Sequence, residues 1–412
     1  MRILHTSDWH LGRSLLGKRR YPEFTQFLDW MLQCIDEQKI NVLIIAGDIF
    51  DTTTPSVTAQ DQYYNFLAKA ATKASCQHIV VIGGNHDSPN FLNAPGAILK
   101  SLDIHVVGQA CEDIKDEVLV LKDEQDQVKL IVCAVPFLSD RDIRRYIPLE
   151  SLEDKDQRII EAHHQHYQAV AEYAKQLATQ HNVPIVATGH LFMTGGLTND
   201  GDGVRDLYVG TLGQLKTDLF STEFNYVALG HIHQHQKVGG FDHIRYSGSP
   251  LAMCFAEAGR SKKVLIIDFN EHHEADIKEL EVPSFQRLDK ISGNLTSLLS
   301  QLEALKALNE PIWLEVTYDS EELQPNLRSL LQECIKNSEV EILKLINHQR
   351  RNQRLQSEES LETLNELSVE EVFKRLLERQ NIPEEQQSEL IKTYQETIFR
   401  LHQEQESTTE TV

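Results

Sequence analysis

Side chains that bind divalent metal ions follow five short apolar runs in this sequence. In chain order they are Asp8 and His10, then Asp48, then Asn85 with His86 and Asp87, then His190, and finally His231 with His233. Carboxylate, imidazole and amide groups together suit borderline-hard divalent ions such as Mn²⁺. The pattern therefore predicts a metal centre built from distant parts of the chain.

The apolar runs are the elements that must position these residues. Runs of four to six apolar residues, such as residues 42–46 and 79–82, are typical of strands buried on both faces of a sheet. Side chains at several strand ends can converge on one point, which is how a site for two metal ions is assembled. Asp48 is the candidate bridging ligand, because a carboxylate offers two oxygens. A glycine before most of the ligands permits a tight turn and close backbone approach.

The ordered set Asp-x-His, Gly-Asp, Gly-Asn-His-Asp, Gly-His and Gly-His-x-His resembles the calcineurin-like metallophosphoesterases. The resemblance implies two divalent ions, with Mn²⁺ expected and Mg²⁺, Fe²⁺ or Zn²⁺ as alternatives. One ion would take Asp8, His10, Asp48 and His233, and the other would take Asp48, Asn85, His190 and His231. The resemblance also implies that His86 contacts the scissile phosphate and stabilises or protonates the leaving oxygen. Asp87 would orient His86 or hold its loop.

Apolar runs alternate with helical patterns, for example at residues 24–35 and 156–180, as far as about residue 270. This alternation predicts an α/β domain with both sheet faces covered. The late runs around Ile244 and Val264 fall close together, which favours a hairpin and hence mixed sheets. The family resemblance implies a four-layer sandwich, in which two mixed sheets are flanked by helices.

The chain of 412 residues is long enough for several domains. We expect a metallophosphoesterase domain at 1–278, with a boundary close to Pro283, and an α+β cap domain that recognises DNA at 279–352. A linker and helical tail would occupy 353–412, with a capping box at 368–371. The two amphipathic tail helices either dock on a partner or fold back on their own domain, and the sequence leaves both options open.

Composition excludes some classes of protein. The formal net charge of −22 argues against binding nucleic acid by bulk electrostatics, although local basic clusters such as Arg13, Lys18, Arg19 and Arg20 could contact phosphates. The chain begins directly with the first motif, and no apolar stretch approaches the roughly 20 residues that span a bilayer. Six scattered cysteines without a CxxC pair favour free thiols. We therefore expect a cytoplasmic protein without membrane contact.

The sequence around the motifs is similar to bacterial SbcD proteins, the Mre11-type nuclease subunits of SbcCD complexes. The similarity lies in residues 1–12, 227–233, 246–251, 282–288 and 312–316. It implies two-metal hydrolysis of DNA, with ATP-dependent 3′→5′ double-strand exonuclease and hairpin-opening endonuclease activity, in DNA recombination, replication and repair. It also implies a homodimer within a heterotetramer, with the tail helices bound to SbcC, a Rad50-like ATPase. This chain has no GxxxxGK[ST] loop of its own for ATP.

Two alternatives remain: a phosphatase that uses the same metals, and a scaffold that keeps the fold without catalysis. Loss of ligand residues would mark a scaffold, and no ligand of the motif is missing here. Other histidines have ordinary interpretations. His5, His78 and His105 lie in apolar segments and are expected to be structural. The polar stretch that carries His163 and His166 is expected to face solvent.

Overall fold

The computed structural model describes residues 1–139, 142, 152–193, 215–320 and 324–347, and the single positions 373, 377, 390, 391, 393 and 394. The described residues up to 346 fall almost entirely in one compact unit, and those from 347 onward belong to a second. None of the helices in these ranges is long and apolar enough to cross a membrane.

The first sheet has six strands in the order β14-β13-β1-β4-β5-β6. Its strands are β1 (Ile3–Thr6), β4 (Val42–Ala46), β5 (His78–Ile82), β6 (Ile104–Val107), β13 (Lys262–Phe269) and β14 (Ala275–Val282). The strands β1, β4, β5 and β6 are parallel, whereas β13 and β14 run antiparallel to their neighbours. All residues of β4 and β5 are buried, as their unbroken apolar runs predict.

The second sheet also has six strands, in the order β11-β12-β10-β9-β8-β7. Its strands are β7 (Val118–Lys122), β8 (Val128–Cys133), β9 (Ile185–His190), β10 (Tyr226–Gly230), β11 (Gln236–Val238) and β12 (Phe241–Tyr246). Parallel pairing of β8, β9, β10 and β12 is combined with antiparallel edges at β7 and β11. The chain thus has an α/β fold with mixed sheets, as the alternation of apolar runs and helical patterns predicted.

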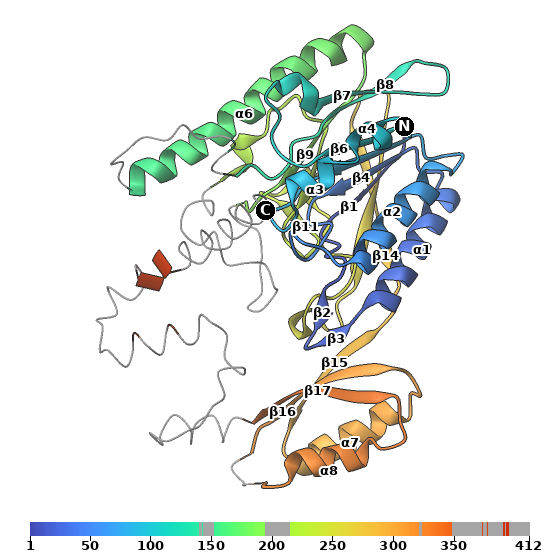
Figure 1. The fold of residues 1–412 in the computed structure, drawn as a ribbon, viewed down its shortest axis with the longest axis vertical. Coiled ribbons are helices and arrows are strands. Elements are labelled where there is room, and N and C mark those ends of the chain that lie inside the picture. The colour runs from blue at the N-terminus through green and yellow to red at the C-terminus, as the bar shows by residue number, and fades with distance from the viewer. Residues whose placement is uncertain are drawn as a thin grey trace, which may run out of the picture. The chain divides into compact units, whose positions relative to one another are not determined.

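Helices pack beside the sheets (Figure 1), and buried side chains form a core between the sheets. The helices α1 (Tyr21–Glu37) and α2 (Val57–Ala71) pack on one face of the first sheet, around Phe27, Phe66 and Leu43. The opposite face shares a core with the second sheet, in which Val80 and Val186 lie. The long helix α6 (Leu152–His181) contacts β7, β8 and β9.

Shorter elements join these. They are the hairpin β2 (Ser14–Leu15) and β3 (Lys18–Arg19), the short helices α3 (Pro89–Asn93) and α4 (Gly96–Lys100), and the 3₁₀ turns η1 (Ile114–Glu117), η4 (Thr217–Leu219) and η5 (Phe255–Glu257).

One expectation about the late strands needs correction. The strands β12 and β13 do not form a hairpin with each other, because β12 pairs with β11 in the second sheet and β13 pairs with β14 in the first. Proximity in sequence suggested the wrong partner, since each strand has a nearer neighbour on its other side. The strand β14 ends at Val282, directly before Pro283, and the division into domains at 1–278 and 279–352 stays a prediction.

A smaller three-stranded sheet follows, in the order β15-β16-β17. It contains β15 (Arg287–Gly293), β16 (Ile312–Tyr318) and β17 (Val340–Asn347), with the helices α7 (Leu295–Lys306) and α8 (Leu327–Cys334). Alternate residues of β16 are buried, and they pack on Leu298 and Leu302 of α7 and on Leu331 of α8. The expected helix and two strands are present, while β15 and α8 are additional.

The expected tail at 353–412 lies mostly outside the described residues, and so does its capping box at 368–371. Of the few described positions, the rings of Phe373 and Tyr394 stack with their centroids 4.0 Å apart. Leu377 is buried. The stacking of Phe373 on Tyr394 joins the two tail segments that the sequence predicts to be helical.

Candidate metal centre

All seven predicted ligands lie at or directly after the carboxyl ends of strands. Asp8 and His10 follow β1, Asp48 follows β4, and Asn85 follows β5 in the first sheet. His190 ends β9, and His231 and His233 follow β10 in the second sheet. Except for Asn85, which is half-buried, all are buried. The two facing sheets therefore present their ligands to a single region.

The residues predicted for one ion lie together. The ligand atoms of Asp8, His10 and His233 are all within 4.8 Å of one another. The Nε2 atoms of His10 and His233 face each other at 3.0 Å. Asp8 also accepts a hydrogen bond from the backbone N–H of His231 at 2.8 Å, which fastens the end of β1 to the end of β10.

The residues predicted for the other ion form a second group. The ligand atoms of Asp48, His190 and His231 lie within 4.8 Å of one another. The Oδ1 atom of Asn85 is 3.1 Å from His190 Nε2 and 3.0 Å from His231 Nδ1. His190 Nδ1 donates to the carbonyl oxygen of Ala46 at 2.9 Å, which turns the lone pair of Nε2 toward this group.

Asp48 lies between the two groups. Its Oδ2 atom is 3.6 Å from His10 Nε2 and 3.3 Å from His190 Nε2. The donor set, which combines imidazole nitrogens with carboxylate and amide oxygens, fits two divalent ions that share one carboxylate.

The electrostatics of these residues fit the same conclusion. Burial alone would raise the pKa of Asp48, but His190 and His86 hold it well below its usual range. Burial would lower the pKa of His190, yet the facing carboxylate of Asp48 raises it to about 9. Burial raises the pKa of Asp8. Buried carboxylates are costly unless a positive charge lies beside them. Protons on the neighbouring histidine rings or divalent cations can supply that charge.

Backbone conformation marks the same positions. Asp8 (φ 53°), His10 (48°), Asp48 (49°) and His231 (100°) all adopt left-handed conformations, although none is glycine. Such conformations cost about 1–3 kcal/mol each and cluster at functional sites. Gly47 before Asp48 has φ 87°, and a Cβ atom there would lie 2.2 Å from His190 Nδ1. The glycine before this ligand is thus required by both conformation and space.

His86 and Asp87 differ in what they contact. His86 is buried, and its Nδ1 donates to the carbonyl oxygen of Asp51 at 2.8 Å. Its Nε2 faces the centre, 4.0 Å from Asp48 Oδ2, and the trio of His10, Asp48 and His86 is itself close enough to hold an ion.

Asp87 accepts the backbone N–H groups of Ile49, Phe50 and Gly84 at 3.1, 3.0 and 2.9 Å. Of the two roles expected for Asp87, these contacts favour holding the loops. Burial, followed by the charge of Asp48, raises the pKa of Asp87 to about 7.

Comparison with known proteins identifies the family. Residues 1–235 match the family model of calcineurin-like phosphoesterases. The whole chain aligns with the SbcD component of the nuclease SbcCD from Escherichia coli strain K12, with 35% identity over 410 residues that cover 99% of this chain and 100% of the relative. The chain belongs to the SbcD family of calcineurin-like phosphoesterases. It is therefore a metal-dependent hydrolase of a nuclease family.

Further SbcD relatives agree with this assignment. The SbcD component of the same nuclease from Bacillus subtilis strain 168 is 32% identical over 323 residues, covering 77% of this chain and 79% of the relative. Its counterpart from Rhodobacter capsulatus is 33% identical over 276 residues, covering 65% and 66%. Residues 284–381 match a family model described as Type 5 capsule protein repressor C-terminal domain.

Sequence reasoning missed Asp51, which connects several parts of this SbcD-type centre. Its carbonyl oxygen holds His86, and its carboxylate lies 3.5 Å from His10 Nδ1 and 2.9 Å from Arg13. Burial would raise the pKa of Asp51, but the contacts with His10 and Arg13 lower it to about 2. Its position three residues after Asp48 was the available signal.

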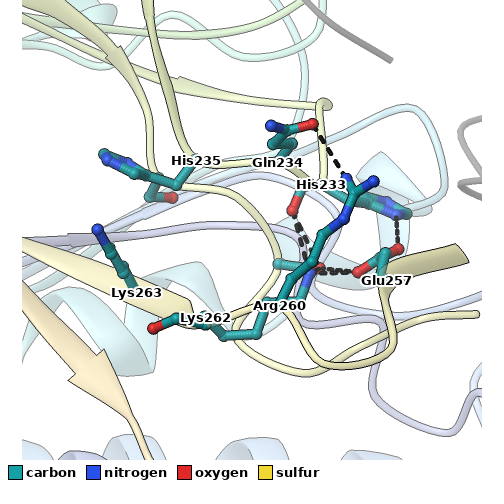
Figure 2. Close-up of a pocket in the computed structure, with 10 residues that line it drawn as sticks. His233, Gln234, His235, Glu257, Arg260, Lys262 and Lys263 are labelled. Atoms are coloured by element: carbon teal, nitrogen blue, oxygen red, sulfur yellow. Dashed lines mark hydrogen bonds and ion pairs between the residues drawn. The ribbon is translucent and has the colours of Figure 1, made fainter. Parts of the chain in front are cut away.

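Glu257 was missed as well, because it lies far from every motif in the sequence. It is 3% exposed, and its Oε1 atom lies 3.7 Å from Nδ1 of the predicted ligand His233 (Figure 2). Lys262 Nζ forms an ion pair with Glu257 and donates to the carbonyl oxygen of His233 at 3.2 Å. Both residues line a cavity of about 340 Å³ behind His233, together with Arg260 and Lys263.

The predicted basic cluster is divided by the structure. Arg13 is held by Asp51 near the centre, Lys18 lies 2.5 Å from Glu341, and Arg19 is exposed. Arg20 departs from the expectation of a phosphate contact. It is 2% exposed and donates to Glu23 and to the carbonyl oxygen of Ala252, each at 2.7 Å, so its guanidinium is committed within the fold.

Proposed function

We propose that this chain is the DNA nuclease subunit of an SbcCD-type complex and hydrolyses phosphodiester bonds at the centre described above. The observation that carries the proposal is the convergence of two ligand groups on the shared carboxylate of Asp48. The full-length similarity to a nuclease subunit supports DNA as the substrate in preference to a phosphoprotein or small phosphate ester.

The roles of individual residues follow from the contacts. Asp8, His10, Asp48 and His233 would hold one divalent ion, and Asp48, Asn85, His190 and His231 the other. Such ions act as Lewis acids on the phosphodiester and make water a stronger nucleophile. His86 is oriented by its Nδ1–H bond to Asp51, so its Nε2 is free to exchange a proton with the leaving oxygen. Asp87 keeps the loops after β4 and β5 in register.

We propose specific activities on DNA as well. They comprise ATP-dependent 3′→5′ double-strand exonuclease activity and hairpin-opening endonuclease activity, with Mn²⁺ as the ion. ATP would be bound by an SbcC partner at the helical tail, and the contact between Phe373 and Tyr394 supports two tail segments that act together. Residues 279–352 would cap a four-layer catalytic domain and recognise DNA. Arg13, Lys18 and Arg19 would contact phosphates, and the complex would contain a homodimer in the cytoplasm.

The test is Mn²⁺-dependent cleavage of an end-labelled DNA hairpin by the full chain, with and without its ATPase partner and ATP. We expect cleavage that requires Mn²⁺ and rises with the partner. The variant His86→Ala should lose cleavage by about 100-fold or more while retaining both bound Mn²⁺ ions, as befits a proton-transfer group. Asp48→Asn should lose both metal and cleavage.

Two results would count against the proposal. Loss of a metal ion in His86→Ala would make His86 a ligand. Absence of DNA cleavage by fully metal-loaded protein under every condition, combined with rapid hydrolysis of phosphoprotein or nucleotide substrates, would assign the centre to a phosphatase.

A further inference from the structure

A second cluster of metal-binding side chains lies at the opposite end of the first sheet. His78 begins β5, Asp103 directly precedes β6, and His105 lies within β6. The ligands of the catalytic centre in this sheet follow the carboxyl ends of strands, whereas these three residues lie at the amino ends of β5 and β6. The cluster is therefore separate from the centre described above.

The strand register places the two histidines of the cluster on one face. The strands β5 and β6 are parallel, with Ile79 opposite Ile104 and Val80 opposite His105. Because side chains alternate between faces along a strand, His78 and His105 project to the same side as Val80. Asp103 lies in the turn directly before β6, and its carboxylate comes within 4.8 Å of the ligand atoms of both histidines. Val80 belongs to the core shared by the two sheets, so the cluster faces the second sheet.

The tautomer of His78 is determined by its contact with the second sheet. Its Nε2 lies 2.7 Å from the carbonyl oxygen of Lys122 at the end of β7. A carbonyl oxygen only accepts, so Nε2 carries the proton and Nδ1 of the neutral ring presents a lone pair. Metal-binding histidines show this arrangement, in which the second ring nitrogen donates to a backbone carbonyl or a carboxylate.

Two ring nitrogens of the cluster have no protein partner. His78 is 9% exposed, and its Nδ1 is buried without a hydrogen bond within the described residues. His105 Nε2 is likewise buried without a partner in that part of the chain. Each of the three side chains offers a ligand atom, and these atoms lie within 4.8 Å of one another. Buried nitrogens left without a partner are costly, and a shared cation would satisfy them together with the carboxylate.

We propose that His78, Asp103 and His105 form a third metal site, which binds a borderline transition ion of the Zn²⁺ class. Imidazole ligands select such ions over Mg²⁺ and Ca²⁺, and one carboxylate supplies negative charge. Three protein ligands leave at least one coordination position for water. The ion would tie β5 to the edge strand β6, and through the Lys122 carbonyl it would fasten the first sheet to β7 of the second.

The test is the Zn²⁺ content of the full chain at equilibrium dialysis, measured by elemental analysis against the dialysate. We expect three ions per chain in the unaltered protein, and two in His105→Gln and in Asp103→Asn. Asp103 has a left-handed backbone (φ 55°), which asparagine also tolerates, so Asp103→Asn should keep the fold. Replacement of an exposed histidine outside the cluster, His272→Gln, is the matched control and should retain three ions.

Thermal unfolding supplies a second readout. In protein already saturated with Mn²⁺, added Zn²⁺ should raise the Tm of the unaltered chain and of His272→Gln by more than that of His105→Gln or Asp103→Asn, because exchange of Zn²⁺ for Mn²⁺ at the catalytic centre is common to all four proteins. Mn²⁺-dependent hydrolysis should be the same in all four proteins. The site is refuted if the unaltered chain binds only two Zn²⁺ ions, or if a third ion persists in both cluster variants.

Discussion

At the scale of single residues, Glu257 is the residue outside the predicted ligand set whose replacement should most clearly change metal affinity. Its carboxylate lies beside Nδ1 of His233 and is held by Lys262 (Figure 2). A carboxylate in this position orients the ring of a metal-binding histidine, and its loss typically reduces metal affinity about 10- to 100-fold. We expect that loss for Glu257→Gln, measured by calorimetric titration of Mn²⁺ into the full chain.

A control separates this positioning role from general stability. Glu271 is exposed, so Glu271→Gln removes the same charge far from the centre and should leave Mn²⁺ affinity unchanged. Unchanged affinity in Glu257→Gln, with a lower Tm, would instead show that Glu257 only anchors Lys262.

The buried side chain of His5 makes the stability of the folded chain depend on pH. It is fully buried in β1, with Nδ1 2.9 Å from the hydroxyl of Tyr226, and burial lowers its pKa from the usual value near 6.5 to about 3. The folded chain therefore keeps His5 neutral while the unfolded chain takes up a proton below pH 6.5. The resulting stabilisation is complete above pH 6.5 and is lost as the pH falls toward 3.

At pH 5 this loss amounts to about 2 kcal/mol. Urea unfolding of the unaltered chain and of His5→Asn, each at pH 7 and pH 5, measures this loss of stability. The two proteins share all other titrating groups, so the difference between them reports on His5. The unaltered chain should lose about 2 kcal/mol more than the variant over this interval. Equal losses in the two proteins would show that His5 also becomes protonated in the folded state.

Residue types pointed to the candidate ligands but not to the residues that surround them. The candidate ligands were recognisable because an apolar run that ends in a small residue precedes each motif, and the structure brings these side chains together. Asp51 and Glu257 were not recognisable, because their partners are set by the packing of distant segments. The same limit explains two histidines expected to face solvent: His163 is buried and bonded to the carbonyl of Ile159, and His166 lies 2.8 Å from the buried Glu117. Both residues lie on the inward face of α6. The polar composition of this segment gave no indication that the helix has a buried face.

At the scale of elements, the turn after β4 is the most constrained. In Gly47→Ala, the new Cβ atom would lie 2.2 Å from His190 Nδ1 and would displace the ring from its bond to Ala46. A shift of about 1 Å in a catalytic group can cost about 100-fold in rate, and we expect a loss in kcat of that order. Steady-state hydrolysis at saturating Mn²⁺ measures the effect.

Gly240→Ala is the matched control for this turn. Gly240 also has a positive φ (78°), but nothing lies within 4 Å of a Cβ atom there. It should carry a similar conformational cost without loss of hydrolysis. Comparable losses in the two variants would attribute the effect to backbone strain instead of to His190.

Elements with a strong local pattern were predictable, whereas strand partners were not. The helix at 24–35 and the strands after residue 311 follow from hydrophobic periodicity, which is a local property. The partners of β12 and β13 depend on which sheet each strand joins, and similar local patterns occur in both sheets. The α/β class could therefore be predicted, but the order of the strands could not.

At the scale of the whole molecule, the candidate metal centre would join the two sheets. Four of the predicted ligands, Asp8, His10, Asp48 and Asn85, follow strands of one sheet, and the other three belong to the second sheet. Ions that bind only the folded chain stabilise it. Removal of Mn²⁺ with a chelator should lower the Tm by about 5–10 °C, as followed by calorimetry. Asp48→Asn, which lacks the shared ligand, should show little change on chelation. A Tm that is independent of Mn²⁺ in the unaltered chain would mean that the centre is already held rigid by protein contacts alone.

The wide spacing of the ligands along the chain also determines when activity can begin. Asp8 and His233 must meet, and β1 is completed on one side only when β13, beginning at Lys262, pairs with it. During synthesis the ribosome must therefore release well over half of the polypeptide before either ion can be fully enclosed. Such non-local pairings also slow the folding reaction. A growing chain thus carries the metal-binding residues well before it has an assembled centre, and activity can begin only after β13 has been synthesised and has paired.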